Sequence, residues 1–332
     1  MDGTATKRAS FSERSAALTR WSVSLMSKKR VCHEDAAKMG FGMNAVAPKR
    51  TFVLGVGAQK AGTTWLHQYL NSFEEVHMGA AKEYHIWNAL NHDLCFNQRL
   101  TFKKIFRTKP NIPVLPYPSR ELAIRLMMQR FDGYYESYFS SLARGRVRIT
   151  GDITPCYAGL DQQTLETIKA RMEGKGFRVK VVFLMRDPVE RCWSSVRHHR
   201  RVLIRSGGCA KMESDEDHLR RTYKTEQMQF RTRYQDTIAN LEAVFTSEDV
   251  WIGLYETMFS EPEVQRLSKF LDVPTNLEFT KKKVNVSPKG KSALNGGTAA
   301  VIQDFYSDVY EYCNERFSAT KDVWRQCAEQ VK

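Results

Sequence analysis

The 332-residue sequence predicts an α/β fold in which a central parallel sheet is flanked by helices. Three observations lead to this prediction. Short apolar runs alternate with longer helix-like stretches along the chain, a glycine-rich segment follows the first run directly, and an Arg-Asp-Pro triplet follows a later run. Both segments are typical of junctions at which a buried strand ends and a helix begins.

The expected strands are short runs rich in β-branched residues, at residues 51–56, 147–150, 179–184 and 250–254. Within the third run, residues 181–185 are continuously apolar, which is the pattern of a strand buried on both faces of a parallel sheet. No internal repeat is visible and nothing suggests a second catalytic domain, so we expect a single domain over residues 49–332. Residues 1–48 would precede it as an N-terminal arm or a targeting segment.

The first element that carries chemistry is the segment 57–65, which reads Gly-Ala-Gln-Lys-Ala-Gly-Thr-Thr-Trp. A glycine-rich turn before a helix directs backbone N–H groups and the positive end of the helix dipole at an anion, and Lys60 adds a full charge. Gly57 and Gly62 have the spacing of a Walker A loop, but Thr63 stands where that motif requires lysine. The segment therefore predicts a phosphate-binding loop that differs from an ordinary ATP or GTP site.

A second element follows the third expected strand and begins with Arg186-Asp187-Pro188. Proline suits the first turn of a helix, so a helix should begin near Pro188. Arg186 would then point into the crevice where open α/β sheets bind ligands, and Ser194 would lie about two turns into the helix. A surface ion pair of Arg186 with Asp187 or Glu190 is the alternative.

Together these two elements resemble sulfotransferases that use 3′-phosphoadenosine-5′-phosphosulfate (PAPS). Segment 57–65 is similar to the 5′-phosphosulfate-binding loop of that family, and Arg186 with Ser194 is similar to its 3′-phosphate-binding motif. The resemblance implies a P-loop-NTPase-like sulfotransferase fold, PAPS as co-substrate and the bisphosphate PAP as product. It also implies that the loop residues contact the nucleotide; these are Gln59, Lys60, Ala61, Gly62, Thr63, Thr64 and Trp65.

The segment 81–87, Ala-Lys-Glu-Tyr-His-Ile-Trp, resembles the glycan-type branch of the family more than the cytosolic small-molecule enzymes. In that branch a glutamate in a Glu-x-His setting is the general base, which implies this role for Glu83. We expect apolar neighbours to raise the pKa of Glu83. His85 is the rival candidate, because its ordinary pKa lies nearer neutrality. The alternatives are a surface ion pair of Glu83 with Lys82 and a packing or hydrogen-bonding role for His85. Lys60 would stabilise the leaving phosphate, so no metal is expected.

Two weaker similarities extend the resemblance. Segment 151–157, Gly-Asp-Ile-Thr-Pro-Cys-Tyr, is similar to a family segment near the acceptor, but Ile153 replaces its lysine, which weakens the case for a glycan acceptor. Segment 281–291 is similar to a late basic loop that closes over the 3′-phosphate. The resemblance implies nucleotide contacts there from Lys289, Gly290 and Lys291, for which a solvated basic loop is the alternative.

Composition limits the partners that we expect. The net charge is +14, yet no nucleic-acid-binding module is visible, and part of the excess charge would serve the PAPS pocket. Seven scattered cysteines favour a reducing compartment, and no apolar run is long enough for a transmembrane helix. We therefore expect a cytoplasmic location, with residues 1–48 as an organelle-targeting segment in the alternative.

The combination of Lys60, Arg186, Ser194 and Glu83 predicts an enzyme. It would move the sulfuryl group of PAPS in line to a hydroxyl or amine of a small-molecule acceptor. A saccharide acceptor is the next hypothesis. The rival of a different class is a nucleotide- or polyanion-binding protein that has the same fold but does not catalyse transfer.

Overall fold

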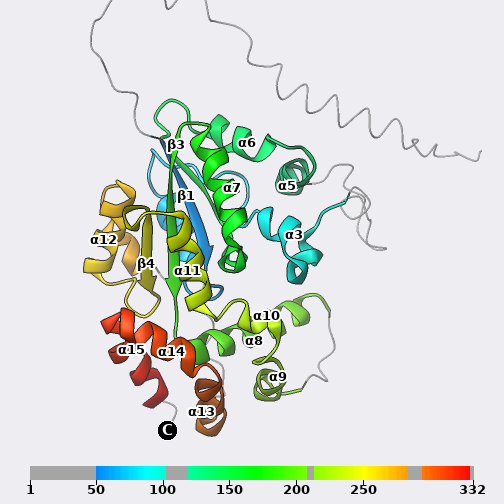
Figure 1. The fold of residues 1–332 in the computed structure, drawn as a ribbon, viewed down its shortest axis with the longest axis vertical. Helices are drawn as coiled ribbons and strands as arrows, with labels where there is room; N and C mark the ends of the chain where they lie inside the picture. The colour runs from blue at the N-terminus through cyan, green and yellow to red at the C-terminus, as the bar shows by residue number, and fades with distance from the viewer. Residues whose placement is uncertain (1–49, 102–118, 208–212, 283–293, 330–332) are drawn as a thin grey trace, which may run out of the picture. The chain divides into compact units, whose positions relative to one another are not determined.

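Four parallel strands form the central sheet of the computed structural model, in the order β2-β1-β3-β4. The structure describes residues 50–101, 119–207, 213–282 and 294–329, all within one compact unit. Helices flank the sheet, and Figure 1 shows α7 and α11 in front of it and α12 beside β4. The predicted fold class is therefore confirmed. The arm expected at residues 1–48 lies outside the described residues. The strands are β1 (Arg50–Gly57), β2 (Ile149–Ile153), β3 (Phe177–Met185) and β4 (Val250–Leu254).

The helices that follow these strands position the candidate residues. Among the described residues the α-helices are α2 (Thr63–Leu70), α3 (Trp87–Asn91), α5 (Arg120–Arg130), α6 (Tyr134–Leu142), α7 (Gln162–Glu173), α8 (Pro188–Arg205), α9 (Asp215–Thr222), α10 (Glu226–Gln229), α11 (Tyr234–Val244), α12 (Glu261–Leu271), α13 (Gly296–Phe305), α14 (Ser307–Arg316) and α15 (Ser318–Glu329). Short 3₁₀ segments are η1 (Asp93–Gln98), η2 (Pro155–Gly159), η3 (Ser247–Asp249) and η4 (Leu277–Lys281).

The strand β2 differs from the expected one in both of its ends. It begins at Ile149 rather than 147 and continues to Ile153. Glycine and aspartate disfavour strands in isolation, but here they pair with β1, with Gly151 opposite Val53 and Asp152 opposite Leu54. Tertiary pairing thus extends the strand through residues whose own propensity argues against it.

The strand order places the ends of β1 and β3 side by side. β1 pairs with β2 on one side and with β3 on the other, so the chain passes from one side of β1 to the other between β2 and β3. Ligands of open parallel sheets bind outside the carboxyl ends of the strands at such a reversal. The segments that follow Gly57 and Met185 therefore both begin at the carboxyl-end edge of the sheet, as the sequence predicts.

The helix α8 begins at Pro188, where the sequence predicts it. Asp187 is its N-cap and accepts a hydrogen bond from the N–H of Glu190 at 2.9 Å. Proline occupies the first helical position, where no N–H is needed. The cap and the proline together fix the start of the helix, and so fix Arg186 in the turn between β3 and α8.

Candidate functional site

The glycine-rich loop after β1 leaves the start of α2 without a capping side chain. Gly62 occupies the N-cap position with φ 90°, a left-handed conformation that favours glycine, and a Cβ there would lie 2.5 Å from the Met258 sulfur. The N–H of Ala58 donates to the carbonyl of Leu184 at 2.6 Å, which ties the loop to β3. The N–H groups of Trp65 and Leu66 donate to the Gly62 carbonyl, so the N–H groups that precede them are the ones that an anion could bind.

The side chain of Lys60 lies in a strongly positive environment. Its pKa falls to about 8, first because of burial and then because of the nearby cations of Arg201, Arg186 and Lys82. Glu83 opposes this effect as the nearby carboxylate. Cations that converge in this way destabilise one another, and a bound multivalent anion would relieve the repulsion.

Arg186 connects the strand-end motif to the loop. One guanidinium nitrogen donates to the Lys60 carbonyl at 3.1 Å, and the other lies 3.1 Å from the Glu190 carboxylate. The guanidinium also stacks over the Tyr255 ring at 4.5 Å from its centre. The ion pair with Glu190, which was the alternative considered from the sequence, is therefore present, and Arg186 contacts the loop at the same time. Binding of a ligand by Arg186 stays a prediction.

The serine that contacts the loop is not the one that the sequence singled out. Ser194 lies in α8 with 4% of its surface exposed. The neighbouring hydroxyl of Ser195 donates to the side-chain carbonyl of Gln59 at 3.5 Å. Sequence reasoning missed Ser195, because two adjacent serines differ only in the helix face they occupy. Contact of Ser194 with a nucleotide stays a prediction.

Two of the predicted loop residues, Ala61 and Trp65, are buried in the core beneath the loop. Ala61 is fully buried, and the Trp65 ring, 2% exposed, stacks on Tyr69 at 4.9 Å and meets Phe259 and Phe279 edge-on. Trp65 thus anchors α2 in the core in this structure. The partly exposed members of the loop are Gln59, Lys60, Gly62 and Thr64, while Thr63 is buried.

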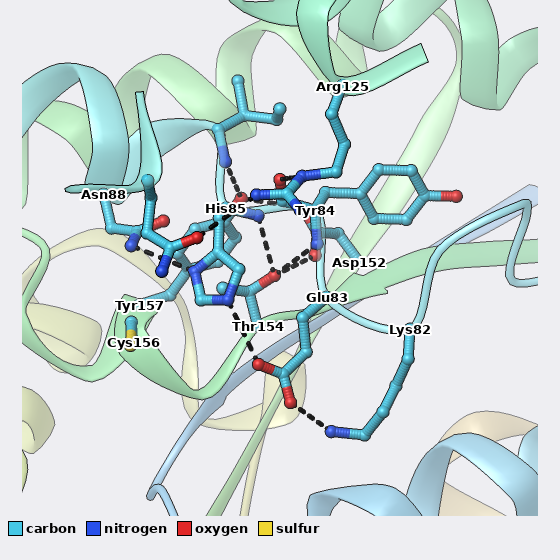
Figure 2. Close-up of polar contacts among 12 residues, drawn as sticks. Lys82, Glu83, Tyr84, His85, Asn88, Arg125, Asp152, Thr154, Cys156 and Tyr157 are labelled. Atoms are coloured by element: carbon cyan, nitrogen blue, oxygen red, sulfur yellow. Dashed lines mark hydrogen bonds and ion pairs between the residues drawn. The ribbon is translucent and has the colours of Figure 1, made fainter. Parts of the chain in front are cut away.

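Glu83 is bound by two cationic side chains (Figure 2). One carboxylate oxygen contacts the Lys82 ammonium and the other accepts from Nε2 of His85 at 3.2 Å. Burial raises the pKa of Glu83, but the hydrogen bond from His85 and the charge of Lys82 outweigh it and hold the pKa at about 2. Burial lowers the pKa of His85, but contacts with Cys156 and Glu83 raise it to about 9.

The expected increase in the Glu83 pKa is therefore wrong, because His85 and Lys82 lower the pKa by more than burial raises it. The side chains of Tyr84, Ile86 and Trp87 are buried in the core. His85, which adopts a left-handed conformation with φ 54°, instead contacts Glu83, and Glu83 also contacts Lys82. At neutral pH Glu83 is ionised and His85 is protonated.

The segment 151–157 lies behind Glu83 and His85. The Thr154 hydroxyl accepts hydrogen bonds from the N–H groups of Tyr84 and His85, at 3.0 and 3.4 Å. Ile153, which replaces the family lysine, is fully buried and packs against Gly55. In this chain the segment contributes no charged side chain at that position, and its polar residues support the backbone that carries Glu83.

Other candidate features lie elsewhere. Lys289, Gly290 and Lys291 fall outside the described residues.

A cavity of about 1070 Å³ lies beside β4 and is lined by residues of β4, α11, α12 and α14, none of them a candidate. Across the described ranges no cluster of His, Cys, Asp and Glu suits a metal ion. None of the helices in those ranges combines the length and apolar character of a membrane span.

Known proteins resemble this chain in structure but not detectably in sequence. No family model matches it, and no curated protein does. The sulfotransferase from Alicyclobacillus acidocaldarius superposes with a TM-score of 0.51 and 19% identity, over 79% of this chain and 93% of that one. The sulfotransferase STF9 from Mycobacterium avium gives 0.44 and 14%, over 81% and 77%. The sulfotransferase domain from the curacin biosynthetic pathway gives 0.41 and 16%, over 78% and 98%.

Only the first of these superpositions is close enough to carry an argument, and it concerns the fold. The chain therefore has the P-loop-like fold of a sulfotransferase.

Proposed function

We propose that this protein transfers the sulfuryl group of PAPS to a hydroxyl or amine of a small-molecule acceptor. The observation that carries the proposal is the hydrogen bond from Arg186 to the Lys60 carbonyl. It joins two predicted phosphate-binding motifs, 126 residues apart in the chain, at one edge of the sheet. Glu83 interacts electrostatically with Lys60, so a candidate base lies near the predicted phosphate-binding lysine.

The residues present fit a nucleotide with two phosphate positions. The uncapped start of α2 and the Lys60 ammonium would hold the 5′-phosphosulfate. Arg186 would hold the 3′-phosphate together with the helix-borne hydroxyl of Ser194, and Ser195 would orient Gln59. Lys289, Gly290 and Lys291 stay candidates for closing over this phosphate. When bound, PAPS supplies an activated sulfuryl group and a phosphate leaving group.

Glu83 is the better base of the two candidates. It is ionised at neutral pH and can accept a proton, whereas His85 already carries one. Its pKa of about 2 makes it a weak acceptor while Lys82 and His85 both bind it. A multivalent anion held near Lys60 would attract Lys82 away from Glu83 and raise the Glu83 pKa. Lys60 would stabilise the charge that develops on the leaving phosphate.

A saccharide acceptor is our second hypothesis for the acceptor. It follows from the similarity of the Glu-x-His segment to the glycan-type branch, which predicts this class of acceptor. The burial of Ile153 argues against it, because no side-chain charge is present where that branch has a lysine.

A protein that binds the nucleotide without transferring sulfate is the second candidate function. The observation that favours it is the tight pairing of Glu83 with Lys82 and His85, which lowers the basicity of the carboxylate. The two functions differ in one measurement, since only the enzyme releases PAP from PAPS when an acceptor is present.

Thermal unfolding with adenosine 3′,5′-bisphosphate, ADP and ATP tests the nucleotide site. We expect the bisphosphate to raise the melting temperature most and Lys60→Met to abolish that rise. Lys175→Met, an exposed lysine before the amino end of β3, is the matched control and should keep it. Equal shifts for all three nucleotides would refute the proposed co-substrate.

Turnover with labelled PAPS and a panel of alcohol, amine, phenol and saccharide acceptors tests the chemistry. Glu83→Gln should abolish transfer and leave the bisphosphate-induced thermal shift nearly intact. Loss of transfer only in His85→Ala would reassign the base to His85. Bisphosphate binding without transfer to any acceptor would support the binding protein instead.

A further inference from the structure

Three consecutive backbone N–H groups next to Glu83 are bound by side-chain hydroxyls and not by secondary structure. Those of Tyr84 and His85 donate to the Thr154 hydroxyl, at 3.0 and 3.4 Å. That of Ile86 donates to the Tyr157 hydroxyl at 3.2 Å. The backbone that carries both candidate bases therefore depends on two hydroxyl groups from the segment that follows β2.

Both hydroxyls in turn donate to one carboxylate, that of Asp152 (Figure 2). The distances are 2.7 Å from Thr154 and 2.8 Å from Tyr157, and the Tyr135 hydroxyl adds a third bond at 3.0 Å. Asp152 is fully buried in β2. A carboxylate only accepts, so it orients the protons of these hydroxyls toward itself and leaves their lone pairs for the N–H groups.

The carbonyl groups of the same segment are fixed from the opposite side. Nε of Arg125 donates to the Tyr84 carbonyl at 2.7 Å, and the Gln129 side chain donates to the His85 carbonyl at 3.1 Å. His85 has φ 54°, a left-handed conformation that residues with a Cβ rarely adopt. Hydrogen bonds on both sides hold it there, and this conformation directs its ring toward Glu83.

We propose that Asp152 is a positioning residue, which fixes the Glu83–His85 pair by orienting the hydroxyls of Thr154 and Tyr157. The consequence for catalysis rests on the proposed function, whereas the effect on the backbone does not. Burial raises the pKa of Asp152, and the hydrogen bonds from Thr154, Tyr157 and Tyr135 oppose this increase. The three hydroxyl groups thus compensate the buried carboxylate, and the carboxylate in turn fixes their orientation.

Tyr157 and Tyr135 form a matched pair for the test. Both are buried and both donate one hydrogen bond to Asp152, but of the two only the Tyr157 hydroxyl also accepts from a backbone N–H of residues 83–87. Tyr157→Phe and Tyr135→Phe remove the same kind of bond from the carboxylate. Thr154→Val is the third variant, since it removes the other acceptor without changing the size of the side chain.

Amide hydrogen exchange in a peptide that spans residues 83–87 measures the positioning directly, without any turnover. We expect faster exchange in Tyr157→Phe and Thr154→Val than in the wild type, and wild-type exchange in Tyr135→Phe. Unchanged exchange in the first two variants would overturn the proposal. So would equal acceleration in Tyr135→Phe at the same global stability.

Steady-state kinetics then measures the effect on Glu83. Misplacement of a catalytic group by about 1 Å can cost on the order of 10²-fold in rate, so we expect kcat to fall by this order in Tyr157→Phe and Thr154→Val. The KM for PAPS and the bisphosphate-induced thermal shift should stay at wild-type values, as should the kcat of Tyr135→Phe. A parallel loss of bisphosphate binding would indicate a general structural role and would overturn the positioning role.

Asp152→Asn tests the carboxylate itself. Its electrostatic interaction with His85 predicts that the variant lowers the pKa of His85, which an NMR titration of the imidazole detects. An unchanged His85 titration together with unchanged exchange would overturn the proposal. If Asp152→Asn does not fold, the Tyr157 and Thr154 variants decide the question. Absence of turnover in the wild type refutes the proposed function and leaves the exchange result valid.

Discussion

The N-cap aspartate of α8 predicts an unusual dependence of stability on pH. Asp187 caps the helix that follows Arg186, and its second oxygen accepts from the Tyr310 hydroxyl at 2.9 Å. Burial, opposed by these hydrogen bonds, raises its pKa from 3.8 to about 7, with further increases from the charges of Glu256 and Glu190. We consider the substitution Asp187→Asn, which keeps the cap because asparagine caps helices about as well as aspartate.

The magnitude follows from the shift of the pKa. Between pH 3.8 and about 7 the unfolded chain has lost this proton and the folded protein keeps it, so stability decreases as pH rises. A tenfold change in a protonation equilibrium is worth about 1.4 kcal/mol, so ionising Asp187 costs on the order of 4 kcal/mol by pH 8. Asp187→Asn removes this cost. The free energy of unfolding of the variant should therefore equal that of the wild type near pH 4 and exceed it increasingly as pH rises.

Urea unfolding at pH 4.5, 6 and 8 measures the effect. Asp161→Asn is the matched control, because Asp161 caps α7 at an exposed site and its hydrogen bonds to Thr164 lower its pKa. For Asp161 the stabilisation is present above the unfolded pKa and disappears as pH falls through the folded one. Because the Asp161 window lies below pH 3.8, the difference in stability between Asp161→Asn and the wild type should stay nearly constant at these three pH values, whereas the difference for Asp187→Asn should grow. An Asp187→Asn variant that loses stability at pH 8 would refute the reasoning.

Three further predictions concern the loop and the base. The bisphosphate-induced thermal shift should decrease as pH rises past about 8 in the wild type, because Lys60 loses its charge there, and should persist in Lys60→Arg. Glu83→Gln should lower the pKa of His85 from about 9, since the carboxylate stabilises the imidazolium; an NMR titration measures it. Gly62→Ala should destabilise the fold in urea by more than the ~1 kcal/mol of left-handed strain, because its Cβ meets a methionine sulfur. Gly145 is also in a left-handed conformation, but no atom lies within 4 Å of the added Cβ, so Gly145→Ala should lose only the strain energy.

The parts of the fold that local patterns specify were predictable from the sequence. The apolar run 181–185 is a buried strand, and Asp187 with Pro188 marks the helix start that the structure contains. These features depend on neighbours within a few residues. The same holds for the turn that starts α2, where Gly62 supplies the left-handed conformation.

The surroundings of the candidate base were not predictable in the same way. The ion pair of Glu83 with Lys82 was the alternative considered from the sequence and is present, whereas the contact with His85 and the burial of the apolar neighbours were not foreseen. The role of Asp152 depends on pairing of β2 with β1, which positions it behind a segment about 70 residues earlier. These polar contacts join residues that are far apart in the chain, and no periodic pattern in a single sequence predicts such contacts.

The contact between Arg186 and the Lys60 carbonyl has a consequence for how the protein responds to its ligand. The two motifs belong to β1 and β3, which pair directly, so a nucleotide that binds both would act as a non-covalent cross-link between neighbouring strands. By mass action it would stabilise the folded chain by about 2.7 kcal/mol at a hundredfold excess over Kd. A fragment that ends before residue 186 would have the loop but lack this second anchor. Nucleotide affinity would therefore indicate whether β1 and β3 have paired.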